Sequence, residues 1–208
     1  YLLTAPKMGK QRTASAGAPG DEAARWDSID WPAARRTVRR LQCRIAQAVK
    51  DGRWNKVKAL QHLLTRSLAA KRLAVRRVTS NQGRTTPGVD GAVWRGARVK
   101  GQAVQRLRRR GYQAQPLRRI YIPKKSGNKK RPLSIPTMHD RAMQALYKQA
   151  LAPVAETTAD PNSYGFREGR RCADATAAGF NALAKPNSAS WILDADIQGC
   201  FDNIRKDW

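Results

Sequence analysis

Basic residues are segregated into one continuous block of this chain, and this segregation limits what the chain can fold into and bind. Between residues 35 and 131 there are 29 Lys or Arg residues and two acids, Asp51 and Asp90. Outside the block there are 12 basic and 13 acidic residues, so the block accounts for all of the positive net charge of +26. A surface built only for solubility would intersperse the two signs. The block therefore predicts a polyanion-binding surface, with nucleic acid as the first candidate.

Composition disfavours several other classes of protein. An anionic membrane surface is the rival partner, but no apolar run approaches the roughly 18 residues that a membrane span needs. The three cysteines, Cys43, Cys172 and Cys200, are far apart, which disfavours a zinc site or a disulfide framework and fits a reducing compartment. We expect a cytosol-like compartment, with an organelle as the alternative. Residues 1–30 lack a secretory apolar core and are expected to form a flexible tail.

Apolar residues recur at helical spacing inside the block. One set predicts an amphipathic helix: Val38, Leu41, Ile45 and Val49. After a break at Gly52, another set predicts a second helix that forms a hairpin with the first: Val57, Leu60, Leu64 and Leu68. These stripes belong to the core, so polyanion binding is assigned to the basic residues beside and after them: Arg35, Arg36, Arg39, Arg40, Arg44, Arg66, Lys71, Arg72, Arg76 and Arg77.

A glycine- and proline-rich loop over residues 79–94 and a basic helix over about 101–110 lead into a predicted β-hairpin. Residues 117–122 predict one strand, "KKSGNKK" its tip and residues 131–135 the return strand. The basic residues at this tip would repel one another without a counter-charge, so a phosphate cluster is the expected partner. They include Lys124, Lys125 and Arg131.

Two further helices are predicted after Pro136. The first begins near His139, which we interpret as a helix-start residue rather than a ligand, and ends before Pro153. The second is a small-residue helix over about 172–184. No internal repeat or heptad array is present.

Residues 191–197, "WILDADI", predict a strand with Asp194 and Asp196 on one face. Two such carboxylates need a cation or donors, and a hard Mg²⁺ prefers carboxylates and water. Beside a phosphate-binding surface, this indicates metal-assisted phosphoryl or nucleotidyl transfer. The alternative is that the acids cap turns and pair with arginine.

The stretch "LDADIQGCFDNI" resembles motif A of reverse transcriptases. The resemblance implies that Asp196 is the catalytic aspartate that binds Mg²⁺ and that Ile197 offers its backbone carbonyl to the metal. It implies that Phe201 lies under the sugar of the nucleotide and selects deoxynucleotides. Many members of the family carry Phe where this chain has Cys200, a departure that leaves the aromatic position intact.

Three further stretches are similar to group II intron-encoded reverse transcriptases and maturases: the block from "PLRRIYIPKK" to "LAPVAE", the block "SYGFREGRRCADA", and the basic region that ends in "TPGVDG". The resemblance implies an α+β fold: right-hand polymerase fingers and a partial palm, with a basic helical N-terminal extension. The implied domains are a tail over 1–30, the extension over 31–116, and the fingers with the start of the palm over 117–208.

The resemblance also implies an activity and its partners. The chain would be part of an RNA-directed DNA polymerase that binds intron RNA to promote splicing and retrohoming, copies an RNA template, and uses a DNA primer or target and dNTPs. Arg131 and either Lys124 or Lys125 would contact the triphosphate. The second catalytic aspartate block would lie beyond Trp208, so the fragment alone is expected to be inactive. The alternatives are a non-catalytic splicing factor on the same scaffold, or another branch: retron, diversity-generating or CRISPR-associated.

Overall fold

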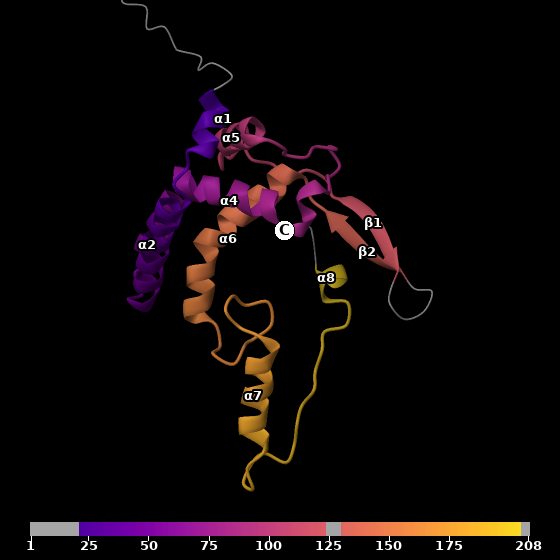
Figure 1. Cartoon of the computed structure of the whole chain (residues 1–208). Helices are drawn as coiled ribbons and strands as arrows, with labels where there is room; N and C mark the ends of the chain where they lie inside the picture. Colours follow the sequence, from indigo (N-terminus) through magenta and orange to yellow (C-terminus); the bar gives the residue numbers. More distant parts are fainter. Residues whose placement is uncertain (1–20, 124–129, 205–208) are drawn as a thin grey trace, which may run out of the picture. The chain divides into compact units, whose positions relative to one another are not determined.

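The computed structural model describes residues 21–123 and 130–204, which divide between two compact units, Tyr1–Thr158 and Ala159–Trp208. The first unit contains α1 to α6, the short 3-10 helix η1 and the strands β1 and β2, and the second contains α7 and α8 (Figure 1). The described elements thus form mixed helical structure with one small sheet, which confirms the α+β class.

Helix α2, Trp31–Lys50, confirms the first predicted amphipathic helix. The Asp30 carboxylate caps its N-terminus by accepting a hydrogen bond from the Ala33 N–H at 2.9 Å, and Pro32 occupies the first turn. The predicted apolar stripe is buried in full. Helix α1, Asp21–Asp27, precedes it, and the Trp26 and Trp31 rings meet edge to face at 5.1 Å. The flexible tail predicted over residues 1–30 is therefore wrong for residues 21–30, because Trp26 and Ile29 are buried in the core.

The second predicted helix is in fact two helices. α3, Trp54–Arg66, packs against α2, and α4, Leu68–Ser80, begins after a break at Ser67, whose extended ψ of 130° leaves the helical region. The break lets each helix bury its own stripe: Leu64 is fully buried in α3 and Ala74 in α4, whereas Leu68 stays 46% exposed. The helical spacing of apolar residues in the sequence gave no sign of this break, because Leu68 follows Leu64 at a helical interval.

Residues 82–107 connect α4 to the rest of the first unit. η1 covers Gln82–Thr85, and α5 covers Ala97–Arg106, starting and ending about four residues before the predicted basic helix. α5 packs closely on α1, since a Cβ added to Gly101 would lie 2.8 Å from the Glu22 carbonyl oxygen. Leu107, just past the end of α5, is fully buried and holds the following segment to the core.

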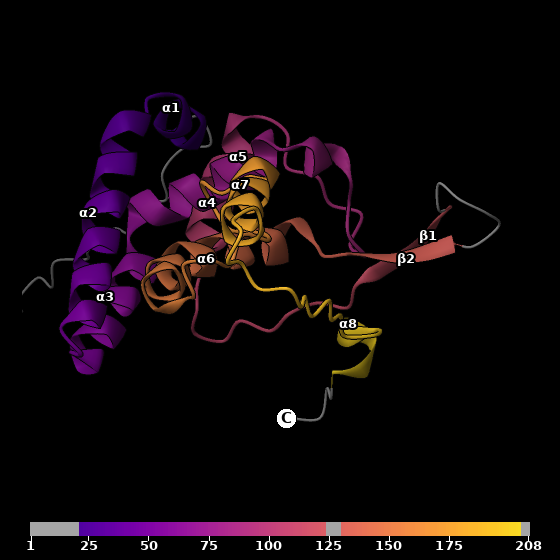
Figure 2. The same ribbon diagram turned by 90° about the horizontal axis from the view of Figure 1, so that it is seen from below.

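The predicted β-hairpin is present. β1, Arg118–Pro123, pairs antiparallel with β2, Lys130–Ile135, with Ile120 opposite Leu133. Most of its residues are exposed, and the hairpin extends away from the helices of its unit (Figures 1 and 2). Residues 124–129 of the predicted tip, including Lys124 and Lys125, lie outside the described residues.

Helix α6, Met138–Thr158, does not end before Pro153 as predicted; it continues through the proline. A proline lacks an N–H, so the carbonyl four residues earlier loses its usual donor. That carbonyl, of Gln149, accepts a hydrogen bond from the Gln42 side chain of α2 at 2.9 Å, and the next one, of Ala150, accepts from Gln61 of α3 at 3.0 Å. Neighbouring helices therefore supply the donors at the point where the sequence predicted a stop.

In the second unit, α7 covers Cys172–Leu183, as predicted within one residue, and α8 is a single turn, Cys200–Asn203. The strand predicted over residues 191–197 is wrong: no strand forms there, and the described residues of the second unit contain no strand at all. A strand needs a partner for its backbone groups and a face to bury. Trp191 and Leu193 instead remain about nine-tenths exposed, at 91% and 90%.

Candidate nucleic-acid interface

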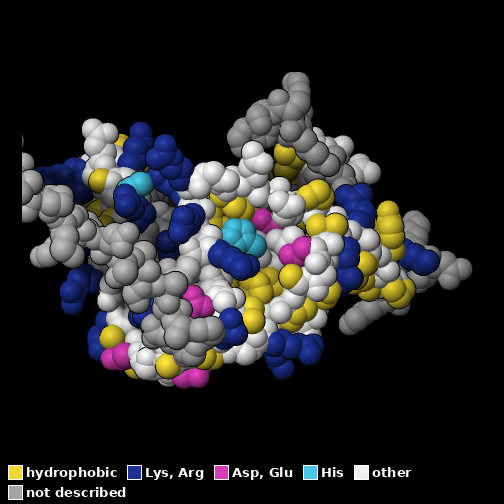
Figure 3. All heavy atoms as spheres, turned by 90° about the horizontal axis from the view of Figure 1, so that it is seen from above, with side chains coloured by type: hydrophobic (Ala, Val, Ile, Leu, Met, Phe, Trp, Pro, Cys, Tyr) yellow, Lys and Arg dark blue, Asp and Glu magenta, His cyan; other side chains and the backbone are white. Residues whose placement is uncertain are grey.

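The five predicted arginines of α2 form an exposed basic face on the helix. Arg36, Arg40 and Arg44 lie four residues apart and so share one side, with Arg35 and Arg39 beside them. All five side chains are exposed, while the apolar stripe of the same helix faces the core. Dark blue Lys and Arg side chains also dominate over acids on the face of the molecule seen in Figure 3. The α2 face is therefore free to meet phosphates.

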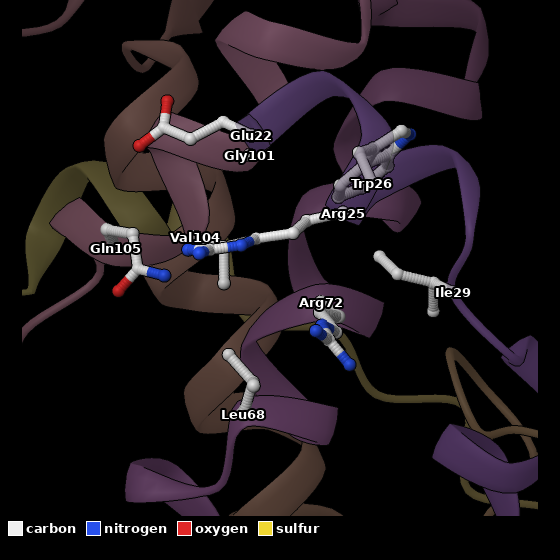
Figure 4. Close-up of a pocket in the computed structure, with 9 residues that line it drawn as sticks. All are labelled: Glu22, Arg25, Trp26, Ile29, Leu68, Arg72, Gly101, Val104 and Gln105. Carbon is white, nitrogen blue, oxygen red and sulfur yellow. The ribbon is translucent and has the colours of Figure 1, made fainter. Parts of the chain in front are cut away.

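The predicted basic residues of α4 are arranged differently. The Arg76 guanidinium lies 4.5 Å from the centre of the Trp31 ring and ties α4 to α2 by a cation–π contact. Arg72 lines a pocket between α1, α4 and α5, and Arg25 of α1 extends across the same pocket (Figure 4). Both α4 side chains are partly buried, so packing is part of their role. Arg66 and Arg77 are exposed, and Lys71 is partly buried.

A second basic surface, which the sequence analysis did not single out, surrounds a cavity between the end of α4 and the start of α5. Three cationic side chains, a tryptophan, two hydroxyls and a glycine line it: Arg84, Arg95, Lys100, Trp94, Thr79, Thr85 and Gly96. Arg84 lies within the predicted loop over residues 79–94, and Arg95 and Lys100 follow it. Their closeness in the sequence could have indicated a basic surface, but only folding brings these side chains around one cavity.

The loop beside this cavity is fastened to the start of α6. Gly88 lies so close to Thr137 that an added Cβ would be 2.5 Å from the Thr137 Cα. The Arg141 guanidinium donates hydrogen bonds to the carbonyl oxygens of Gly83, at 2.8 Å, and Thr86. These contacts hold the loop next to the base of the hairpin, because β2 ends at Ile135, two residues before Thr137.

A buried carboxylate organises the same corner. Asp140 is 3% exposed and accepts hydrogen bonds from the Tyr112 hydroxyl and the Thr137 hydroxyl, each at 2.7 Å, and from the Gln115 N–H at 3.3 Å. Burial alone would raise the pKa of Asp140, but these donors outweigh it and hold the pKa below its usual value. Burial and the bond to Asp140 raise the pKa of Tyr112 to about 12. The sequence analysis missed this cluster.

On the hairpin, Arg131 is exposed on β2 and pairs in register with Ile122 of β1. Strand β1 also brings exposed Arg119, and β2 exposed Lys130, to the same small sheet. The structure therefore gathers exposed cations on this hairpin.

The predicted catalytic residues belong to the second unit. Asp196 is exposed, and its Oδ1 accepts a hydrogen bond from the Ile197 N–H at 2.9 Å. Asp194 is also exposed. The Phe201 backbone lies in α8, which follows Gly199 in the left-handed conformation at φ 58°; its side chain is outside the described residues.

Residues 196–197 carry oxygen donors of the type that a magnesium site needs. A carboxylate and a backbone carbonyl at residues 196–197 are hard oxygen donors of the kind Mg²⁺ takes. Yet among the side chains that the structure describes, no group of three His, Cys, Asp or Glu residues could hold a metal ion. Residues 196–197 therefore offer one part of a metal site.

Two family comparisons cover most of the chain. Residues 26–116 match the N-terminal domain of reverse transcriptase, and residues 122–208 match the reverse transcriptase (RNA-dependent DNA polymerase) domain. The chain therefore belongs to the reverse transcriptases. Its resemblance to the group II intron-encoded members is confirmed by the relatives described next.

Three relatives illustrate the similarity. Group II intron-encoded protein LtrA of Lactococcus lactis is 35% identical over 138 residues, 64% of this chain and 22% of that protein. A protein in the cob intron of Schizosaccharomyces pombe is 31% identical over 65% of this chain and 16% of its own length. Protein YkfC of Escherichia coli is 35% identical over 63% of this chain and 36% of its own length. The chain thus spans well under half of each relative.

Helix length and hydropathy were also compared with what a membrane span requires. None of the helices in the described part of the chain is both long enough and apolar enough to cross a bilayer.

Proposed function

We propose that this chain forms the basic N-terminal extension, the fingers and the early palm of a right-hand RNA-directed DNA polymerase encoded by a mobile group II intron. Residues 31–116 would be the extension, and 117–208 the fingers and the start of the palm. One observation carries the proposal: two reverse transcriptase domains match in succession, and most of the basic block lies in the first. The host compartment is the cytoplasm of a bacterium or an organelle.

Reverse transcriptases and group II intron proteins generally bind RNA and DNA and use dNTPs with a divalent metal. In this chain, the exposed α2 arginines would bind both the intron RNA and the RNA template. Binding of the intron RNA would promote splicing and retrohoming. Their exposure and the absence of acids among them support this role. A DNA primer or target is the remaining partner.

For the chemistry, Asp196 and the Ile197 carbonyl would hold Mg²⁺, which when bound lowers the cost of charge on the nucleotide phosphates. Phe201 would lie under the sugar, and Arg131, with Lys124 or Lys125, would contact the triphosphate. The exposure of Asp196 and Arg131 is compatible with these roles. Because two-metal catalysis needs more than one carboxylate, we expect the 208-residue chain alone not to extend a primer.

RNA binding is the direct test on this chain. The triple variant Arg36→Gln/Arg40→Gln/Arg44→Gln should weaken binding to a structured intron RNA and flatten its salt dependence by about three ions, because each arginine neutralises about one phosphate. The matched control is Arg98→Gln/Arg106→Gln/Arg110→Gln, which removes the same charge from exposed positions in and after α5. Equal losses in both variants would refute a specific role for α2.

The catalytic half is tested in the longer protein. Asp196→Ala should abolish DNA synthesis and leave RNA binding intact, whereas the α2 triple variant should impair RNA binding first. If the parent protein binds RNA but makes no DNA, the non-catalytic splicing factor is the better description. Loss of both functions in each variant would point to misfolding instead.

A further inference from the structure

Five nitrogen-bearing side chains from three segments converge in the first unit, and no function has been assigned to them as a group. We call them the His62 cluster: His62 and Arg66 of α3, Lys71 of α4, and Arg108 and Arg109 after α5. Arg109 Nη2 lies 2.7 Å from His62 Nδ1, and Arg66 Nη1 lies 3.4 Å from His62 Nε2. The sequence places Arg109 47 residues from His62, so only folding brings them together.

Lys71 belongs to the same group. Burial lowers the pKa of the Lys71 ammonium, and the nearby charges of Arg108 and Arg66 lower it further. These two arginines therefore lie close enough to act on Lys71 from the other two segments. Like charges that are brought together in this way destabilise one another unless an anion lies between them.

The cluster contains no anion of its own. Among the described residues, no carboxylate contacts any of its five members. The hydrogen-bonding groups of the cluster are mostly donors, since both ring nitrogens of His62 face guanidinium donors. A neutral imidazole can accept at only one of its two nitrogens, so the cluster has more donors than its own acceptors can satisfy.

We propose that the His62 cluster binds one phosphate group of RNA between Arg66, Lys71 and Arg109, with Arg108 adding charge. A phosphate supplies both the missing negative charge and the missing acceptor oxygens. His62 is a positioning residue, because its Nδ1 orients the Arg109 guanidinium. The proposal rests on the proposed RNA-binding function. The phosphate is either an internal phosphodiester or a terminal 5′-phosphate, which share the same oxyanion chemistry.

The experiment measures binding of the full 208-residue chain to one RNA hairpin, made with a 5′-phosphate and with a 5′-hydroxyl, over a range of salt concentrations. Lys71→Gln and Arg109→Gln should each weaken binding by roughly threefold to tenfold and lower the salt slope by about one ion. The control Arg98→Gln removes one exposed charge from α5, outside the cluster. It should have a smaller effect.

Two further measurements separate one shared phosphate from general charge loss. The double variant Lys71→Gln/Arg109→Gln should lose less than the product of the two single effects, because both residues contact the same group. His62→Ala should weaken binding without removing a formal charge, and His62→Gln should restore it in part, because its side-chain carbonyl can accept from Arg109. A structural role alone would not distinguish these two His62 variants by RNA affinity at equal folded content in circular dichroism.

The outcomes are distinct. Equal loss for both hairpins assigns an internal phosphodiester, and loss only for the phosphorylated hairpin assigns a terminal phosphate. If the cluster variants behave like Arg98→Gln, or if their effects multiply, the phosphate site is refuted while RNA binding through α2 stands. If neither the cluster variants nor the α2 triple variant changes RNA affinity, the proposed function itself fails.

Discussion

The two compact units of this chain differ in how their apolar residues are used. In the first unit, all six α-helices from α1 to α6 contribute to one continuous core, in which Ile45, Leu64 and Met143 are fully buried. In the second unit, none of the described residues is buried, and Phe180, Trp191 and Leu193 are largely exposed. The lesson is that apolar content alone does not make a core, because burial needs a facing element.

The same contrast separates the two halves of the proposed function. The exposed arginines of α2 stand on a helix whose opposite face is packed, so their positions are set by the core. Asp196 stands on an extended segment without such support.

The largest difference is expected for one leucine in each unit. Leu64→Ala should lower the free energy of unfolding by about 2–5 kcal/mol, because it opens a cavity in a fully packed site. Leu193→Ala should change it by less than about 0.5 kcal/mol, because that side chain is 90% exposed. Urea denaturation of both variants measures the difference. A comparable loss in Leu193→Ala would mean that the second unit is packed after all.

The buried carboxylate gives the next effect. At neutral pH, Asp140→Asn should destabilise the chain by about 1.5–3 kcal/mol, since it weakens charged hydrogen bonds to three donors. The pKa of Asp140 is lower in the folded chain than in the unfolded chain, so the folded chain binds fewer protons between the two values. Its contribution is therefore complete above the unfolded pKa of about 3.9 and is lost as the pH falls through the folded value.

The corresponding measurement is urea denaturation at pH 7 and at pH 3. The gap between the original chain and Asp140→Asn should narrow at the lower pH. Asp51→Asn is the control, because Asp51 is exposed and accepts one hydrogen bond from the Gln47 side chain. If the difference in the free energy of unfolding between the two chains stays constant over this pH range, the stabilisation does not come from the charge of Asp140.

Backbone packing at the loop should give a somewhat smaller effect. Gly88→Ala should cost about 1–3 kcal/mol, because the new methyl group meets the backbone of Thr137 and the loop must shift. Gly165→Ala in the second unit has open space around its Cβ position and should be neutral or slightly stabilising. Thermal unfolding compares the two. Equal melting temperatures would show that the loop yields without strain.

The smallest effect is expected where α2 supports α6 at Pro153. Gln42→Ala should cost about 0.5–1.5 kcal/mol, because it leaves the partly buried Gln149 carbonyl without its donor. Gln47→Ala, on the exposed side of the same helix, removes a side chain of equal size and should cost less. Hydrogen exchange of α6 amides around residue 153 should increase only in Gln42→Ala. An unchanged exchange rate would show that water replaces the donor.

Much of the first unit was predictable because its signals are local. Helical spacing identified the buried face of α2, and turn residues flanking two short apolar runs identified the β1–β2 hairpin. The exposed arginines of α2 followed from the same periodicity. Their predicted contact with RNA remains a prediction, as do the roles of Asp196, Phe201 and Arg131.

The predictions of secondary structure fail where contacts between residues distant in the sequence determine the structure. The break at Ser67 allows α3 and α4 to bury separate faces, and α6 passes Pro153 because glutamines of α2 and α3 supply donors. The strand predicted at 191–197 does not form, because alternation of side chains does not provide a pairing partner.

The sequence by itself determined the charge of the basic block, the periodic faces of its helices and the order of the reverse transcriptase motifs, because these are properties of neighbouring residues. Only the tertiary structure decided which basic side chains meet. His62 and Arg109, or Arg84 and Lys100, come together across long stretches of chain because helix packing closes those distances. Electrostatic interactions depend on separation in space, which the order of residues does not specify.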